Sequence, residues 1–181
     1  MPEILQSLDA QLLLWIQDTV RQSVLDPLVC FYTALGNAGM LWIAISVLLL
    51  CYRPTRKAGA VSLLALAIGF LCTNVVLKHL VGRPRPWLDV AGLTALIDEH
   101  DPNSFPSGHT CAAFAAATVW FRAFERKWGA IALVMAAAMG FSRLYVGVHY
   151  PSDVLFGALV GAVSGAAAWK LTGQLEKGKL K

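Results

Sequence analysis

The sequence predicts an all-α integral membrane protein, a bundle of about five transmembrane helices preceded by an amphipathic helix at the membrane interface. Of the 181 residues, 57% are hydrophobic and only 14% are charged, whereas soluble domains contain about 45–50% apolar and about 25% charged residues. The apolar residues form long runs, and most basic residues lie in short segments between these runs. A single domain over residues 1–181 suffices for a chain of this length.

Residues 4–20 carry apolar side chains at helical spacing and polar side chains elsewhere; the apolar positions are Leu5, Leu8, Leu12, Trp15 and Ile16. This pattern predicts an amphipathic helix that lies in the membrane interface and does not cross it. A helix packed on the bundle explains the pattern equally well. The N-terminal sequence MPEILQSLDAQ lacks both the basic segment and the small-residue cleavage site of a secretory signal, so we expect no such signal.

The first apolar run, residues 28–52, is interrupted by the sequence Gly-Asn-Ala-Gly at 36–39. Either one long tilted helix runs through it, or a short interfacial helix ends at Gly36 and a span begins near Gly39. We favour the second interpretation, although that span is shorter than the usual length of about 20 residues. Further spans are predicted at 58–80, 108–123, 128–147 and 152–172. The last contains Gly157, Gly161 and Gly165, a spacing that lets helix backbones approach closely in lipid.

The distribution of charge predicts the orientation of the bundle. With five spans, ten basic residues fall on one side, which should be the cytoplasm; they are Arg53, Arg56, Lys57, Arg122, Arg126, Lys127, Lys170, Lys177, Lys179 and Lys181. Nine of the eleven acidic residues fall on the other side, together with segments 81–106 and 142–153. The net charge of +4 therefore reflects membrane topology, and we expect no nucleic-acid partner.

The four cysteines lie in apolar stretches without metal-ligand spacing; they are Cys30, Cys51, Cys72 and Cys111. We interpret them as small core residues and expect neither a disulfide nor a zinc site.

Segment 142–153 places three ionisable residues at the ends of two apolar runs, namely Arg143, His149 and Asp153. Inserting such side chains at membrane depth costs about 2.5–3.5 kcal/mol each for Arg or Asp, which favours a functional role. Pro151 fits the first turn of a helix. Asp153, four residues after His149, can accept a hydrogen bond from one imidazole nitrogen and leave the other as a nucleophile. The alternative is a capped loop with an unused histidine and arginine.

The second span ends at Lys78, and Gly82 can terminate its helix. Arg83 and Arg85 each precede a proline, which holds them in extended backbone near Lys78. A plain basic cluster flanking the membrane is the alternative, but this cluster lies on the side where positive charge is otherwise scarce.

The third span begins with Pro106, Ser107, Gly108 and His109. Proline and serine are typical of helix starts, and a helix N-terminus binds anions through its free N–H groups and its dipole. Gly108 has no side chain, so an anion can approach the backbone, and His109 can donate a proton. An ordinary capped helix with an interfacial histidine would explain this motif taken alone.

Together these stretches combine cations, a helix N-terminus, two histidines and a carboxylate, a set that suits phosphoryl transfer. No cluster of carboxylates is available to hold a metal, because Asp98, Glu99 and Asp101 are expected to form a solvated acidic surface. We therefore expect no metal and no cofactor. The loop over residues 87–104 is expected to help select the substrate, and its run 90–97 is apolar enough to touch lipid.

The sequence resembles the type 2 phosphatidic acid phosphatase (PAP2) superfamily, which also includes vanadium haloperoxidases. Three family motifs occur in order, and they match over residues 78–153: Lys78 with Arg85-Pro86, Pro106-Ser107-Gly108-His109, and Ser142-Arg143 with His149 and Asp153. The resemblance implies a helical bundle and a phosphohistidine intermediate on His149. It also implies that Asp153 orients His149 and that His109 acts as acid and then as base. Phosphate would be bound by Lys78, Arg85, Ser107, Gly108 and Arg143, whereas Arg83 lies outside the pattern and is left with a substrate-contact role at most.

The predicted membrane spans indicate a lipid phosphate substrate, and the resemblance implies a small bacterial phosphatase of the inner membrane. Undecaprenyl diphosphate best suits a site that faces away from the cytoplasm. Phosphatidylglycerophosphate, phosphatidate and lipid A are alternatives, because the motifs bind phosphate and do not specify the lipid tail. A lipid- or anion-binding transporter is the alternative outside the enzymes. The pairing of His149 with Asp153 argues against it, because binding alone needs no oriented imidazole.

Overall fold

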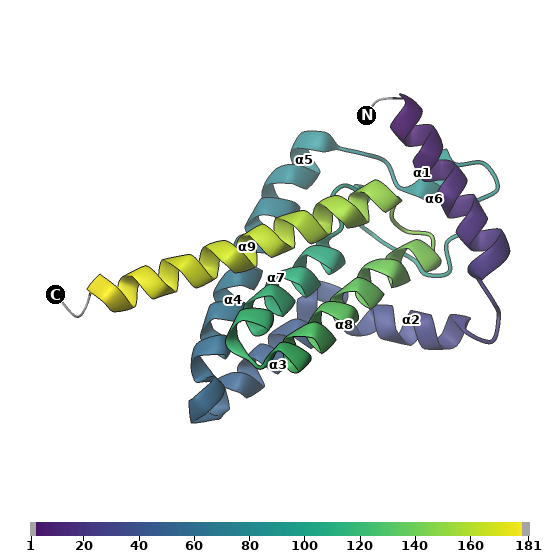
Figure 1. Ribbon diagram of the computed structural model, residues 1–181. Helices are drawn as coiled ribbons and strands as arrows, with labels where there is room; N and C mark the ends of the chain where they lie inside the picture. The colour runs from purple at the N-terminus through teal and green to yellow at the C-terminus, as the bar shows by residue number, and fades with distance from the viewer. Residues whose placement is uncertain (1–2, 179–181) are drawn as a thin grey trace.

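The computed structural model describes residues 3–178, with side chains to residue 174, and all regular structure in this part of the chain is helical (Figure 1). The α-helices are α1 (Glu3–Trp15), α2 (Asp26–Leu35), α3 (Met40–Cys51), α4 (Arg56–Phe70), α5 (Lys78–Val81), α6 (Pro86–Asp89), α7 (Gly108–Ala123), α8 (Arg126–Tyr145) and α9 (Pro151–Gly178). A π-helical segment, Leu71–Leu77, joins α4 to α5. The predicted all-α class is thus confirmed.

Within the part of the chain that the structure describes, three helical stretches are long and apolar enough to cross a membrane: Arg53–Val81, Arg126–Tyr145 and Pro151–Gln174. The pair α2 and α3, bent by 49°, adds a fourth if it counts as one span. α7 begins and ends where predicted, but its 16 residues are fewer than a span usually needs. The prediction of about five spans therefore reduces to three or four by length and composition.

α7 is the central helix of the bundle, with α4, α8 and α9 packed around it (Figure 1). Its alanines Ala113, Ala115, Ala116 and Ala117 are fully buried. α9 approaches it through the predicted glycine stripe, since a Cβ on Gly161 would lie 2.3 Å from a carbonyl oxygen of α7. Neighbouring helices therefore cover most of α7.

The chain breaks between α2 and α3, as the favoured interpretation predicted. Gly36 ends α2, and Ala38 and Gly39 both adopt positive φ angles, +51° and +73°. The break turns the chain by 49° and brings the turn against the N-terminal half of α7.

Both interpretations of the N-terminal helix hold in part. Its inner face is seated on the bundle through the buried residues Asp9, Leu13 and Ile16. Its outer face exposes apolar side chains, among them Leu8 and Trp15, as expected for a helix in the membrane interface. The α-helix ends at Trp15, and residues 16–20 form a π-helical turn.

Two predictions about apolar residues hold only in part. The run 90–97 is not exposed throughout, because Leu93 is buried against α1 and residues 95–97 pack on the segment between α8 and α9. All four cysteines are free, but only Cys111 is buried, whereas Cys51 and Cys72 lie on the exposed outer surface of their helices. A polar–apolar pattern cannot tell a core position from a lipid-facing one, since both are apolar.

The turns that join α3 to α4 and α7 to α8 lie at the same end of the bundle, and α1, α5 and α6 lie at the other (Figure 1). Six of the ten basic residues assigned to one side occupy these two turns or the adjoining helix ends. Lys179 and Lys181 lie outside the described residues.

Candidate active site

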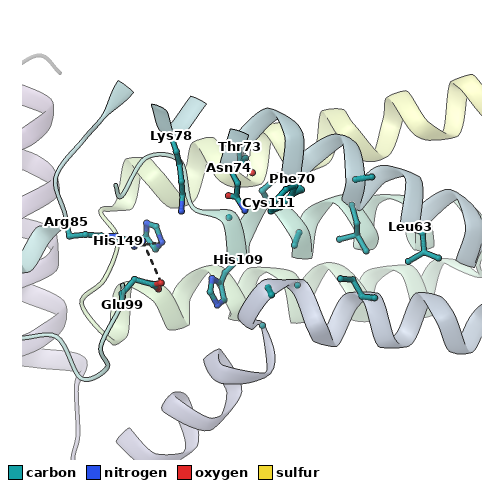
Figure 2. Close-up of a pocket in the computed structure, with 18 residues that line it drawn as sticks. Leu63, Phe70, Thr73, Asn74, Lys78, Arg85, Glu99, His109, Cys111 and His149 are labelled. Carbon is teal, nitrogen blue, oxygen red and sulfur yellow. Dashed lines mark hydrogen bonds and ion pairs between the residues drawn. The ribbon is translucent and has the colours of Figure 1, made fainter. Parts of the chain in front are cut away.

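The three sequence motifs meet at the end of the bundle that carries α5 and α6, around a cavity of about 470 Å³. Its polar end is lined by Lys78, Arg85, Glu99, His109 and His149 (Figure 2), and Gly108 also lines the cavity. From there the cavity runs along α4 toward Phe70 and Leu63, between apolar walls (Figure 2). It therefore has a charged head and an apolar continuation.

His149 is buried in the segment between α8 and α9. Arg85 Nη1 lies 2.9 Å from its Nε2, and Asp153 Oδ2 lies 3.5 Å from its Nδ1. A guanidinium can only donate hydrogen bonds, so Nε2 carries the lone pair and Nδ1 carries the proton. Burial, followed by the charges of Arg85, Arg143 and Lys78, lowers the pKa of His149 well below its usual value. A neutral imidazole in this tautomer is able to act as a nucleophile.

Asp153 is completely buried in the first turn of α9. Its Oδ2 accepts a hydrogen bond of 2.9 Å from the backbone N–H of Tyr150, and its Oδ1 accepts one of 2.7 Å from Arg83. Arg83 does not line the cavity, so the structure places it behind the aspartate and not in contact with substrate.

Arg85 reaches the cavity from the extended segment before α6. It donates to the backbone oxygens of Asp101 and Val148, at 2.8 and 2.9 Å, which fixes the guanidinium beside His149. Burial lowers the pKa of Arg85, and the nearby carboxylates of Glu99 and Asp101 oppose this shift.

Glu99 and Asp101 do not form the solvated acidic surface that was expected. The carboxylate of Glu99 pairs with the buried Arg143 and lies 4.0 Å from Arg85, and that of Asp101 pairs with Lys78. Burial raises the pKa of Asp101, but hydrogen bonds from Lys78 and a backbone N–H, with the nearby cations, bring it below its usual value. Buried cations need counter-charges, and these two side chains provide them.

The N-terminus of α7 forms one wall of the cavity. Ser107 is buried as its N-cap, and its Oγ accepts hydrogen bonds from the backbone N–H and the hydroxyl of Thr110, at 3.4 and 2.9 Å. Gly108 lines the cavity, as predicted, but the Ser107 side chain does not. A Cβ on Gly108 would lie 2.9 Å from Asn74 Oδ1, so only glycine leaves this wall open.

His109 also lines the cavity, and its Nε2 lies 3.0 Å from the side-chain oxygen of Asn37. Asn37 belongs to the break between α2 and α3, and a Cβ on Gly36 would lie 2.8 Å from the His109 ring. Sequence reasoning missed this contact. The signal was the Gly-Asn-Ala-Gly break, which was interpreted only as a helix interruption.

No group of three or more metal-ligating side chains occurs among the residues that the structure describes. The predicted residues that line the cavity are Lys78, Arg85, Gly108, His109 and His149. The other three predicted residues lie directly behind this lining. Arg143 pairs with Glu99, Asp153 pairs with His149, and Ser107 precedes Gly108 in the chain.

The fold and the site together define a helical membrane protein with a histidine and a cluster of cations at one end of its bundle. The chain belongs to the PAP2 superfamily, because the family model matches residues 58–177. Undecaprenyl-diphosphatase BcrC from Bacillus subtilis is 35% identical over 148 residues, which cover 79% of this chain and 72% of the relative. Lipid A 4'-phosphatase from Bacteroides thetaiotaomicron is 29% identical, covering 97% and 84%.

Solved structures give the same result. The crystal structure of Aquifex aeolicus LpxE superposes with a TM-score of 0.81 at 30% identity, covering 90% of this chain and 95% of the other. The PAP2-type phosphatidylglycerolphosphate phosphatase from Bacillus subtilis superposes with a TM-score of 0.78 at 28% identity, covering 95% and 88%. The predicted family and enzyme class, a PAP2-type phosphatase, are therefore confirmed.

Proposed function

We propose that the protein is a lipid phosphatase that hydrolyses a phosphate monoester or diphosphate through a phosphohistidine. The observation that carries the proposal is the shape of the cavity. Its charged end holds two histidines and several cations, and its other end is an apolar channel along α4 that reaches Leu63 (Figure 2). A phosphate attached to a hydrocarbon chain matches both ends.

In the proposed mechanism, Nε2 of His149 attacks phosphorus, and the bond from phosphorus to the leaving oxygen breaks as the phosphorus–nitrogen bond forms. His109 gives its proton to the leaving oxygen. It then removes a proton from water, which attacks the phosphohistidine, breaks the phosphorus–nitrogen bond and releases phosphate. Asp153 holds Nδ1–H of His149 throughout and stabilises the charge that develops on the ring.

Lys78 and Arg85, which line the cavity, bind the phosphate oxygens together with the backbone N–H of Gly108. Arg143 lies behind Glu99 and joins them when phosphate displaces that carboxylate. Ser107 caps the helix whose N-terminus faces the phosphate, so its contribution is to the helix end and not a direct contact. These groups supply positive charge where the transition state gains negative charge, which is the main requirement of phosphoryl transfer. The reaction then needs no metal.

Undecaprenyl diphosphate is the proposed substrate. Relatives named undecaprenyl-diphosphatase from Bacillus subtilis and Sulfolobus acidocaldarius support it. We also propose that the active site faces away from the cytoplasm across a bacterial inner membrane, because six basic residues lie in the two turns at the other end of the bundle or at the adjoining helix ends. Lipid A, phosphatidylglycerophosphate and phosphatidate are alternatives, the first two supported by relatives with those names. A relative named bacitracin transport permease protein keeps a transport function as the second candidate.

The test is phosphate release by purified protein from the four lipids side by side, with and without a chelator. We expect turnover without metal, fastest on undecaprenyl diphosphate, and no turnover by His149→Ala. The matched control is His79→Ala, because His79 is exposed and does not line the cavity. Binding without phosphate release would favour transport, and loss of turnover in chelator with recovery in Mg²⁺ would refute the metal-free mechanism.

The roles of the two histidines are separated by the leaving group. General acid catalysis is typically worth about 10²–10⁴-fold, but nitrophenolate leaves without protonation. His109→Ala should therefore lose much less of its rate of phosphoenzyme formation on nitrophenyl phosphate than on a lipid phosphate, as measured by rapid quench. His149→Ala should form no phosphoenzyme from either. Equal losses for His109→Ala on both substrates would refute its role as the acid.

Orientation is tested with single cysteines in a background without the native four. Ala91, near the active-site end, and Glu125, in the turn before α8, are both exposed. We expect an impermeant thiol reagent to label position 91 and not position 125 on intact cells. The reverse pattern would refute the proposed orientation.

A further inference from the structure

Behind the active site, Arg83 links the catalytic aspartate to the N-terminal helix. Its Nη1 donates to Asp153 Oδ1 at 2.7 Å and to the hydroxyl of Ser152 at 2.8 Å. Its Nη2 donates to Asp9 Oδ2 at 2.7 Å and to Gln6 Oε1 at 2.6 Å. Each arm of the guanidinium thus serves a different helix, α9 on one side and α1 on the other.

We propose that Arg83 and Asp9 are positioning residues that hold Asp153 against His149, so that α1 is part of the catalytic apparatus as well as an interfacial helix. This inference rests on the proposed function, because it assigns Arg83 and Asp9 a task only if Asp153 orients the nucleophile. Neither residue touches the cavity, so neither acts on substrate directly.

The charges explain why both residues are needed. The side chains of Arg83 and Asp9 are only 3% and 4% exposed, and that of Asp153 is not exposed at all. A buried carboxylate needs a counter-charge, and Asp153 receives it from Arg83. Arg83 in turn pairs with two carboxylates, Asp153 through Nη1 and Asp9 through Nη2. The two ends of a guanidinium can serve two carboxylates in this way, whereas an ammonium has a single charged nitrogen.

Asp9 fixes the same region by a second route. Its Oδ1 accepts a 3.0 Å hydrogen bond from the backbone N–H of Ser152, and its Oδ2 accepts from the Ser152 hydroxyl. Ser152 lies in the first turn of α9, immediately before Asp153. A carboxylate of α1 therefore caps the helix end that carries the catalytic aspartate, where it also complements the helix dipole.

Tyr150 completes the arrangement. The guanidinium of Arg83 lies 3.7 Å from the centre of the Tyr150 ring, and the backbone N–H of Tyr150 donates to the Asp153 oxygen that faces His149. Arg83 thus supports both oxygens of Asp153, one directly and the other through the residue stacked beneath it. A change in the position of Arg83 would therefore alter the orientation of His149 through the Asp153 carboxylate.

The test is a double-mutant cycle on nitrophenyl phosphate, a small substrate that does not need the lipid channel. Residues that orient a metal-binding side chain are typically worth about 10–100-fold in activity, and we expect a similar factor for residues that orient Asp153. We expect Arg83→Gln to lower kcat by about that factor with KM unchanged, and Asp9→Asn to act in the same direction. In the Asp153→Asn background, neither change should reduce kcat further, because the residue through which they act is already altered. A merely structural role would instead reduce kcat in both backgrounds.

Asp18→Asn is the matched control, because Asp18 is an exposed carboxylate on the π-helical turn 16–20 that continues α1; its kcat should equal that of the wild type. If Arg83→Gln does not purify as a folded protein, the cycle of Asp9→Asn with Asp153→Asn decides. Unchanged kcat in Arg83→Gln or Asp9→Asn, or losses that persist in the Asp153→Asn background, would overturn the inference. Full activity of Asp153→Asn itself would instead refute the proposed role of Asp153 in the reaction. Failure of the proposed function is thereby distinguished from failure of the inference about Arg83 and Asp9.

Discussion

Glu99 competes with phosphate for the cations of the active site, so replacing it with glutamine should strengthen anion binding. Its carboxylate pairs with Arg143 and lies 4.0 Å from Arg85. Phosphate needs the same two guanidinium groups. Glu99→Gln keeps the shape and one accepting oxygen but removes the charge, so an entering anion has less to displace.

The size of the effect follows from the distance. Two unit charges 4 Å apart interact by about 4 kcal/mol at an effective dielectric constant of about 20. The Glu99 side chain is 24% exposed, and glutamine retains a hydrogen bond to Arg143, so only part of this energy is released. We expect about 1–2 kcal/mol, which corresponds to an inhibition constant for vanadate lowered by about 5- to 30-fold.

The same change should destabilise the protein when no anion is bound, because the buried Arg143 loses its only carboxylate among the described residues. Leaving a buried charge with weaker partners typically costs about 1–3 kcal/mol. Glu99→Gln should therefore have a lower Tm alone and a larger rise in Tm with vanadate than the wild type. These opposite shifts distinguish competition from a general loss of structure.

The assay is inhibition of nitrophenyl phosphate hydrolysis by vanadate, with Tm measured on the same samples. Asp98→Asn is the control, since Asp98 carries the same charge in the same loop but is exposed. An inhibition constant for Glu99→Gln that equals or exceeds that of Asp98→Asn would refute the reasoning. It would mean that Glu99 helps to build the anion site and does not compete for it.

Three further predictions follow from other contacts. Gly161→Ala should overpack α9 on α7, lower the free energy of unfolding by about 1–3 kcal/mol and lower the Tm by about 2–4 °C per kcal/mol. Gly173→Ala is the control, because nothing lies within 4 Å of its added Cβ, and equal Tm values for the two variants would contradict the packing. Asn37→Ala should reduce turnover of a lipid phosphate more than of nitrophenyl phosphate, because it frees the ring of His109; equal losses would contradict that role. Burial and neighbouring cations hold the pKa of His149 well below 6.5, so the neutral imidazole persists as pH falls through 6.5. The rate of phosphoenzyme formation, corrected for substrate ionisation, should therefore not fall to half its maximum near pH 6.5, and such a fall would contradict the prediction.

Helix boundaries were predictable because their causes are local. The span predicted at 108–123 coincides with α7, whose start is set by Pro106 and Ser107 immediately before it. Gly82 ends α5 in the left-handed conformation, and Pro151 begins α9, both as expected. The number of spans was less predictable, since α7 is too short to pass as a span alone and is apolar because protein surrounds it.

The motifs predicted which residues meet at the site, but not their partners. Asn37 lies 72 positions from His109, and Glu99 lies 44 positions from Arg143. The Gly-Asn-Ala-Gly sequence around Asn37 indicates a break in the helix, but it does not indicate which residue Asn37 contacts. Such pairings depend on how the helices pack, which a pattern of apolar residues does not determine.

The wrong prediction that Glu99 and Asp101 form a solvated surface arose because the buried cations were not assigned counter-charges. The exposure of these counter-charges also divides the cations into two kinds. Buried cations are almost always paired, so acidic residues on the same face should have been assigned to them first. Glu99 and Asp101, the partners of the cavity cations, are 24% and 37% exposed and can move aside for phosphate. Asp9 and Asp153, the partners of Arg83, are 4% and 0% exposed, so neither side chain can move away from Arg83 into solvent. The first kind of cation can exchange a carboxylate for substrate, whereas Arg83 is fixed in place, which is what a positioning role requires.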